Sequence, residues 1–404
     1  MPDIIKIAIV FTAILVFLRL KWNIGYVLLL ASGILAILYL MPVSTILSTI
    51  KSAVADPITI KLFFALTLIR ILEMVLREKQ VLAKMMDASR HILRRKKAVI
   101  ISMPMLIGLL PSLGGAYFSA PMVAESTKGL KMTPEEKGFI NYWFRHPWEY
   151  MLPLYPGILL ASAITNIELR NLMLVNTTYA VLIIITGFLF SMRGVKGRYS
   201  IEERKSGSVE SKDSKASELW SFLPVTLILI FVIVFHIELH YSLAITILGL
   251  FVFYKVGPKD IFRTLKYGFT KDVILLIFGA MLFKFTMENS GAVVHLSSYF
   301  SEKGIPLLPV LFMLPFVSGL LTGLTVGFVG GTFPVIVSLA GGAYLNQITF
   351  AFAAGFLGVL LSPVHLCLVL TREYFKADIW GIYKRIIPAT CIIMAAALVM
   401  YFAL

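Results

Sequence analysis

Charged residues are scarce in this chain of 404 residues: they make up 15% of it, whereas hydrophobic residues make up 58%. The mean hydropathy is +0.87. These values exclude an ordinary soluble domain and predict an all-α polytopic membrane protein. The few charges are unbalanced, with 37 Lys and Arg against 22 Asp and Glu. Because the basic residues cluster in short segments between apolar runs, they indicate contact with a lipid bilayer and no nucleic-acid partner.

Cysteines and enzyme motifs are also nearly missing. The two cysteines, Cys367 and Cys391, lie in apolar runs without neighbouring metal ligands, so we expect buried thiols and neither a metal nor a cofactor. No Gly-Lys-Ser/Thr motif is present, which excludes an ATP-driven pump with a P-loop. Residues 236–240 read His-Ile-Glu-Leu-His, a spacing that differs from the zinc-binding H-E-x-x-H pattern, and they fall in a turn between apolar runs. The sequence therefore predicts that the protein is not an enzyme.

The apolar runs divide into two halves, and a membrane span needs about 20 such residues. We predict a first half over residues 1–192, a polar linker over 193–217 and a second half over 218–404. The first run has no basic segment before it, so we expect a retained span and not a signal peptide. Each half contains five predicted crossings. An odd number of crossings predicts that the halves are inverted repeats.

A shorter apolar stretch interrupted by small and hydroxyl residues occupies the same place in each half. The first covers residues 98–125 and the second residues 306–339. Non-helical backbone at membrane depth survives only inside protein or beside a wet cavity. Gly/Pro-interrupted segments at matching places in two halves also indicate a transporter binding site. We interpret both stretches as re-entrant hairpins whose tips meet near the midplane; the alternative is two helix contacts lined by glycine.

A span interrupted by proline follows each hairpin. Residues 141–164 contain Pro153 and Pro156, and residues 348–370 contain Ser362 and Pro363. Proline frees backbone carbonyls that need new partners, so we predict a helix break in each span. A basic amphipathic segment at residues 77–97 is predicted to be an arm on the cytoplasmic surface.

The distribution of Lys and Arg predicts the orientation. Residues 77–97 and 193–217 contain many of these basic residues and are placed in the cytoplasm, which puts both termini outside. We expect a multi-pass protein of the cell membrane.

Candidate binding residues are the hydroxyl and glycine residues of the predicted tips and the residues of the predicted breaks. Helix N-termini suit an anion, and exposed carbonyls suit a small cation. These candidates are Ser112, Gly114, Gly115, Ser119, Pro153, Pro156, Thr322, Thr325, Gly327, Gly330, Gly331, Thr332, Ser362 and His365. For His365, a hydrogen-bonded core histidine is the alternative to a ligand.

Two further groups of ionisable residues stand within or near the spans. Arg145, His146 and Glu149 can bind an anion or a proton, or can form an interfacial cluster with aromatic neighbours. Ionisable groups inside spans are functional by default. Helical spacing nevertheless favours structural ion pairs, with a proton relay as the alternative. The expected pairs are Arg70 with Glu73, and Lys284 with Glu288.

Two motifs extend these predictions by resemblance. Residues 111–123 read Pro-Ser-Leu-Gly-Gly-Ala-Tyr-Phe-Ser-Ala-Pro-Met-Val, and residues 141–149 read Asn-Tyr-Trp-Phe-Arg-His-Pro-Trp-Glu. Together with the order of elements, they resemble an uncharacterised prokaryotic integral-membrane family that is best populated in archaea and thermophilic bacteria. That family is distantly similar to the gluconate permeases of the ion-transporter superfamily. The resemblance implies an elevator mechanism, in which hairpins and broken spans move solute past a scaffold braced by the arms.

The tips depart from one branch of that superfamily. The sodium-coupled dicarboxylate transporters have Ser-Asn-Thr at both tips, where this chain has Pro-Ser-Leu-Gly-Gly from Pro111 and Thr-Gly-Leu-Thr from Thr322. Sodium coupling and a dicarboxylate substrate therefore do not follow from the resemblance.

The expected function is that of a symporter, a secondary active transporter of a small anionic solute such as an organic acid or sugar acid, driven by H+ or Na+. The alternatives are a channel, an intramembrane enzyme and a non-transporting membrane assembly protein. A homodimer is compatible with the sequence, which does not decide the oligomeric state.

Overall fold

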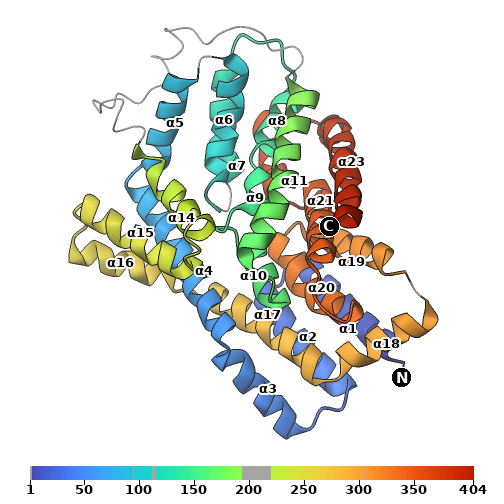
Figure 1. The fold of residues 1–404 in the computed structure, drawn as a ribbon. Helices are drawn as coiled ribbons and strands as arrows, with labels where there is room; N and C mark the ends of the chain where they lie inside the picture. Colours follow the sequence, from blue (N-terminus) through green and yellow to red (C-terminus); the bar gives the residue numbers. More distant parts are fainter. Residues whose placement is uncertain (1, 94, 112–114, 193–219, 305) are drawn as a thin grey trace.

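The computed structural model describes residues 2–93, 95–111, 115–192, 220–304 and 306–404, and these residues form α-helices without a β-strand (Figure 1). The helices before residue 193 are α1 (Asp3–Arg19), α2 (Ile24–Leu38), α3 (Val43–Ala55), α4 (Pro57–Glu78), α5 (Val81–Ile92), α6 (Lys96–Gly108), α7 (Gly115–Ser126), α8 (Pro134–Trp143), α9 (Pro147–Met151), α10 (Pro156–Thr165) and α11 (Leu169–Ser191). Those after residue 219 are α14 (Leu223–Ile233), α15 (Leu239–Phe253), α16 (Pro258–Gly268), α17 (Lys271–Asn289), α18 (Ala292–Lys303), α19 (Leu307–Thr322), α20 (Thr325–Leu339), α21 (Leu345–Leu361), α22 (Leu366–Phe375) and α23 (Ile379–Ala403). The predicted linker 193–217, Ser112 and Gly114 lie outside the described residues.

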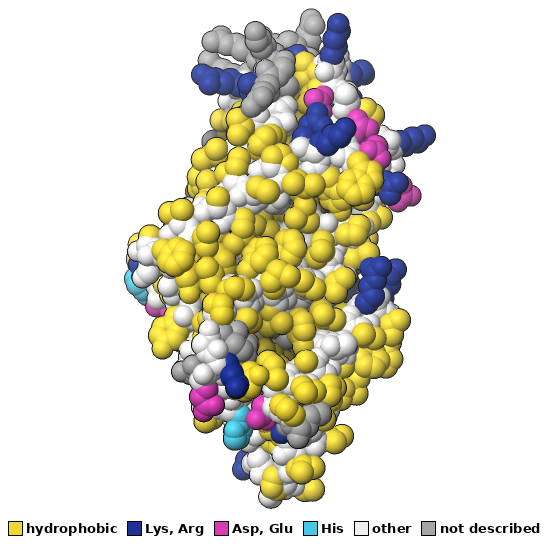
Figure 2. All heavy atoms as spheres, turned by 90° about the vertical axis from the view of Figure 1, so that its right-hand side faces the viewer, with side chains coloured by type: hydrophobic (Ala, Val, Ile, Leu, Met, Phe, Trp, Pro, Cys, Tyr) yellow, Lys and Arg dark blue, Asp and Glu magenta, His cyan; other side chains and the backbone are white. Residues whose placement is uncertain are grey.

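The surface has the apolar character that a bilayer requires. Within the described residues, three segments are long and apolar enough to cross a membrane: α11, Leu345–Phe375 (α21 with α22) and α23. Figure 2 shows a broad apolar band over one face, with Lys and Arg gathered toward its upper end. Large apolar side chains such as Val252 and Phe402 are 79% and 73% exposed. So much exposed apolar surface needs lipid around it, and the chain is a helical membrane protein.

Short polar residues begin several helices. Asn23 accepts from the Gly25 N–H at the start of α2, and Asp56 accepts from the Thr59 N–H at the start of α4. Such caps satisfy backbone donors that have no partner within the helix. They explain why the long apolar runs divide where they do.

A polar cluster joins the beginnings of α8 and α23. Arg385 donates to Glu136 at 2.9 Å, and the Asp378 N–H donates to Glu135 at 3.2 Å. The backbone N–H of Glu135 itself, the Thr133 hydroxyl and the Asp378 N–H lower the pKa of the Glu135 carboxyl by hydrogen bonding. The cluster holds the two helices together outside the apolar band.

Glycines bring the membrane helices close together. Helix α2 packs on α17, where a Cβ on Gly25 would lie 2.3 Å from the Leu275 backbone. Helix α19 packs on α21, where a Cβ on Gly319 would lie 2.1 Å from the Gly355 carbonyl oxygen. Small residues allow such close backbone contact in membranes, where it replaces the hydrophobic effect as the source of helix association.

The second hairpin differs from its prediction. Its limbs, α19 and α20, pack together, but the turn between them is only Gly323 and Leu324. The other candidates of this hairpin are all buried within the continuous helix α20: Gly327, Gly330, Gly331 and Thr332. The interpretation as a re-entrant hairpin predicted non-helical backbone at these residues, and the structure corrects it. Gly330 and Gly331 pack against side chains of other helices: a Cβ on Gly330 would lie 3.0 Å from Leu28, and one on Gly331 would lie 3.1 Å from Ile14. For these glycines the helix-contact alternative describes what the structure has.

The ion pairs expected from helical spacing are also replaced by other contacts. Glu73 pairs with Arg77, one turn further on, while the Arg70 guanidinium lies 4.7 Å from the centre of the Tyr267 ring. An aromatic face attracts a cation, so Arg70 has its partner on another helix.

Lys284 likewise does not contact Glu288. Its Nζ donates to the Ala163 carbonyl at 3.0 Å and to Asn166 Oδ1 at 2.9 Å. The last carbonyls of α10 have no partner within the helix and favour a cation. The lysine therefore joins α17 to the end of the first broken span.

Candidate functional site

Three helix breaks lie at the centre of the site, two in the first broken span and one in the second. In the first broken span, residues 144–146 separate α8 from α9, and residues 152–155 separate α9 from α10. Pro147 and Pro156 are the first residues of α9 and α10, where a proline lacks only an N–H that would be unpaired anyway. In the second broken span, residues 362–365 separate α21 from α22, and Pro363 cannot continue a helix.

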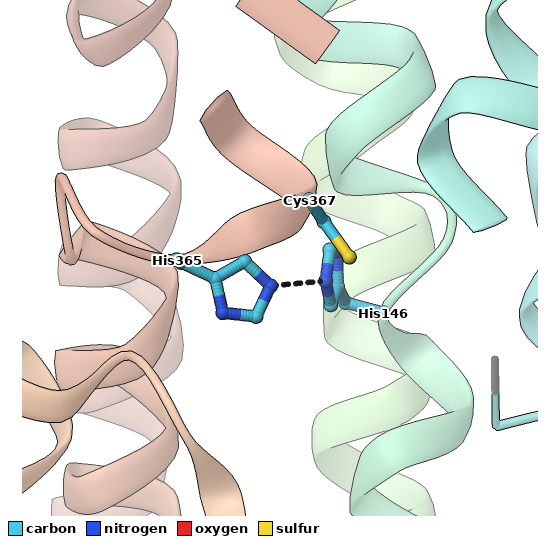
Figure 3. Close-up of side chains that lie close together, drawn as sticks. All are labelled: His146, His365 and Cys367. Carbon is cyan, nitrogen blue, oxygen red and sulfur yellow. Dashed lines mark hydrogen bonds between the residues drawn. The ribbon is translucent and has the colours of Figure 1, made fainter. Parts of the chain in front are cut away.

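The breaks bring together two histidines that are 219 residues apart in sequence. His146 Nε2 lies 3.1 Å from His365 Nε2, and the side chains point toward each other (Figure 3). His146 is fully buried and His365 is 7% exposed. Cys367, on the first turn of α22, directs its sulfur toward the His146 ring (Figure 3). The Cys367 Sγ and one nitrogen of each histidine lie within 4.8 Å of one another.

The turn of the second hairpin, at Gly323, contacts the same pair of histidines. His365 Nδ1 lies 2.8 Å from the Gly323 carbonyl oxygen, and His146 Nδ1 lies 2.6 Å from the Tyr142 carbonyl oxygen. Gly323 has φ +63°, and a Cβ there would lie 2.9 Å from the His365 backbone and 3.1 Å from Ser362 Oγ. A side chain at Gly323 is therefore excluded both by conformation and by space.

A carboxylate lies beside the histidines. Glu149 Oε2 accepts from Thr325 Oγ1 at 2.9 Å, and its Oε1 lies 3.8 Å from His146 Nε2. Thr325 begins α20, and a Cβ on Gly157, near the start of α10, would lie 2.3 Å from Thr325 Cγ2. Two helix N-termini therefore lie against each other beside the carboxylate, and both present partial positive charge.

A buried cation acts on the same group of side chains. Arg145 is 3% exposed and is close enough to Glu149, His365 and Cys367 to affect each electrostatically. The site thus contains a guanidinium, a carboxylate, two imidazoles and a thiol in a buried volume.

The first hairpin contributes a different kind of contact. Ser119 lies within α7, and its hydroxyl donates to Asn141 Oδ1 at 2.7 Å. The Asn141 amide donates to the Ala116 carbonyl at 3.0 Å and to the Thr371 hydroxyl at 2.8 Å. This buried network joins α7, α8 and α22, so Ser119 connects helices away from any tip. Sequence reasoning missed Asn141 and Thr371, although a polar amide in an apolar run is itself a signal of interhelical bonding.

The other sequence candidates are scattered. Gly115 is the buried first residue of α7, and Thr322 bonds within α19 to the Ser318 carbonyl at 2.7 Å. Pro153 lies in the first broken span, between α9 and α10. Ser362 Oγ is buried and has no hydrogen-bond partner among the described residues. The candidates that the structure brings together are Thr325, Glu149, His146, His365 and Ser362.

A separate cavity of about 320 Å³ lies between α4, α10 and the turn from α14 to α15. Lys61 and Glu238 form an ion pair of 2.7 Å on its wall, and His236 and His240 also line it. Residues 236–240 thus form one side of this cavity, and the last two of them, Leu239 and His240, begin α15. The cavity also reaches Asn166, where Lys284 holds the end of α10.

Comparison with known proteins adds a family without an assigned activity. A model of that family, described as a protein of unknown function (DUF401), matches residues 4–404. No curated protein matches the chain. Over nearly its whole length, the chain belongs to the DUF401 family of proteins of unknown function.

Proposed function

We propose that this protein is a secondary active transporter that moves a small anionic solute across the cell membrane by an elevator mechanism. The observation that supports it most directly is the meeting of the breaks with the second hairpin tip through the contacts of His146 and His365 with each other and with Gly323. Discontinuous helices that meet in this way are the usual substrate sites of secondary transporters.

An inverted repeat is supported by pairs of equivalent helix contacts. In order along each half, α2 corresponds to α15 and α4 to α17; α2 packs on α17, and α15 packs on α4. In the same way α3 packs on α17, and α16 packs on α4. The hairpins show the same symmetry: α7 corresponds to α20 and α10 to α22, and α7 contacts α22 while α20 contacts α10. An exchange of the halves converts each contact into its counterpart.

An anionic solute is supported by the charge at the breaks. The N-termini of α10 and α20 lie side by side, and Arg145 is buried close by. Backbone N–H groups at helix N-termini bind carboxylates and phosphates readily. The Ser362 hydroxyl adds a buried polar atom without a partner in the described part of the chain, and it suits a hydroxyl of a sugar acid.

Elevator motion needs one group of helices that moves as a unit. The Asn141 network and the contacts of Glu136 and Glu135 with the α23 region join the first hairpin and both broken spans to the last helix. Lys284 is a contact between these helices and α17, and the cavity of about 320 Å³ lies along the same boundary. A boundary that contains such a cavity is suited to the sliding of one group of helices along the other.

The test is uptake into liposomes that contain the purified protein. A panel of labelled organic acids, with gluconate as the first probe, is offered under an imposed H+ or Na+ gradient. We expect uptake of at least one acid that depends on a gradient, and a loss of more than tenfold in Gly323→Ala, because the new Cβ meets the His365 backbone. The control is Gly33→Ala, where a Cβ meets nothing within 4 Å. Gradient-independent flux, or normal uptake by a folded Gly323→Ala protein, would overturn the proposal.

A further inference from the structure

We propose that His146, His365 and Cys367 form a binding site for one borderline-to-soft transition-metal ion of the Zn2+ class, with Glu149 as the fourth ligand. This site does not depend on the transport function proposed above. Its ligand atoms come from two segments more than two hundred residues apart in sequence, so no motif with a short, fixed spacing predicts them.

The hydrogen bonds of the two histidines leave both Nε2 atoms free to bind a cation. Each Nδ1 faces a backbone carbonyl, that of Tyr142 for His146 and that of Gly323 for His365. A carbonyl oxygen only accepts, so both Nδ1 atoms have protons. In neutral imidazoles, both Nε2 atoms then have lone pairs, which confront each other across 3.1 Å. Two lone pairs at that distance repel, and a positive ion between them removes the repulsion.

The separations fit tetrahedral coordination. With metal–nitrogen bonds of about 2.0–2.1 Å, two nitrogens of a tetrahedral site lie about 3.3 Å apart. The two Nε2 atoms are 3.1 Å apart, and Glu149 Oε1 is 3.8 Å from His146 Nε2. The Cys367 sulfur lies within 4.8 Å of the nitrogen donors. Three donors are thus already grouped, and Glu149, which lies outside that group, must rotate toward them to become the fourth ligand.

The surroundings are those of a metal site. Metal-binding histidines usually donate their other N–H to a carbonyl or carboxylate, which fixes the ring and raises its basicity. Both histidines have that partner. The Tyr142 ring lies 4.6 Å from the His146 ring and 5.6 Å from the His365 ring, centre to centre, and provides an apolar wall. Glu149 is further oriented by Thr325 at 2.9 Å.

The donor set favours a metal over a shared proton. A proton shared between the imidazoles involves only the two Nε2 nitrogens and does not explain why a thiol and a carboxylate lie beside them. A divalent ion can bind all four groups, and together with the buried Arg145 its positive charge stabilises the thiolate and the carboxylate. Sulfur and imidazole together select ions such as Zn2+ over Mg2+ or Ca2+.

Metal binding by the untagged, full-length protein in detergent tests the proposal. The protein is first stripped with a chelator and then titrated with Co2+, and Zn2+ is added to displace it. We expect one Co2+ per chain, the intense visible absorption of a tetrahedral site and a sulfur-to-cobalt charge-transfer band. Mass spectrometry of the metal content measures the stoichiometry independently.

Variants connect the signal to these residues. Cys367→Ser should abolish the charge-transfer band while the protein still folds, and His146→Ala or His365→Ala should weaken Co2+ affinity at least tenfold. The matched controls are Cys391→Ser, at an exposed cysteine, and His240→Ala, in the first turn of α15; both should bind like the parent. Absence of stoichiometric binding, an unchanged charge-transfer band in Cys367→Ser, or equal loss in the controls would overturn the site. Because no transport is measured, its failure is distinct from failure of the transporter proposal.

Discussion

Lys284 offers the sharpest comparison between a contact inferred from helical spacing and the contact that the fold makes. The substitution Lys284→Met retains the length of the side chain and removes its charge and donors. In the structure Lys284 is 5% exposed, and its ammonium group donates to the Ala163 carbonyl and to Asn166 Oδ1 at the end of α10. Glu288, its neighbour by helical spacing, is exposed.

The magnitude follows from the two hydrogen bonds. Each bond from a charged donor contributes about 1.5–3 kcal/mol, and the Ala163 carbonyl loses a partner when the lysine is removed. The cost of burying the ammonium disappears in the variant and offsets part of this loss. We therefore expect Lys284→Met to lower the free energy of unfolding by about 2–3 kcal/mol. Glu288→Gln changes an exposed side chain and should cost less than about 0.5 kcal/mol.

Reversible unfolding in mixed detergent micelles, followed by helical circular dichroism, measures both variants. Lys284→Arg is the matched control that retains a cation. If Glu288→Gln destabilised the protein as much as Lys284→Met, the dominant partner of Lys284 would be Glu288, and the assignment of the lysine to the end of α10 would be wrong.

Two further predictions concern the other charges and the orientation. In double-mutant cycles, Glu73 should couple to Arg77 by about 0.5–1 kcal/mol and to Arg70 by less than about 0.3 kcal/mol, because Arg77 is its ionic partner; a larger coupling to Arg70 would contradict the structure. A membrane-impermeant maleimide should label Glu168→Cys in intact cells and Lys131→Cys only after permeabilisation, since the Lys/Arg distribution places residue 131 in the cytoplasm; the reverse pattern would refute the predicted orientation.

Features fixed by local chemistry were predictable from the sequence. The breaks follow from Pro156 and from the Ser362-Pro363 pair, because proline restricts the helix wherever it occurs. The all-helical membrane class follows from composition and from the length of the apolar runs. These inferences need only the residues next to each other in the chain.

Features fixed by distant contacts were not predictable. Helical spacing predicts Glu288 as the partner of Lys284. The fold instead places the Ala163 carbonyl and Asn166 Oδ1 within hydrogen-bond distance of the Lys284 ammonium, and their position depends on contacts between distant helices. Glycines interrupt an apolar pattern whether they form a tip or line a helix contact, so Gly330 and Gly331 look the same in both cases. The thiol of Cys367 reads as a small apolar residue until the breaks bring it to His146 and His365.

The structure also shows that a central histidine can be both a hydrogen-bonded core residue and a potential ligand. The His146 N–H bonds to the Trp143 carbonyl, so the Tyr142 carbonyl, its expected helical partner, is left for the His146 ring. The His365 ring serves the Gly323 carbonyl at the hairpin turn in the same way. In both rings Nδ1 bonds a backbone carbonyl that a helix end has left without a helical partner, which is what a structural core histidine does. Nε2 remains directed at the other ring, and it is this second nitrogen that is available for chemistry. The first break thus positions the histidine that satisfies its own free carbonyl, and the second positions a histidine that satisfies the carbonyl of the hairpin turn. In both cases the ring points its other nitrogen, Nε2, into the site.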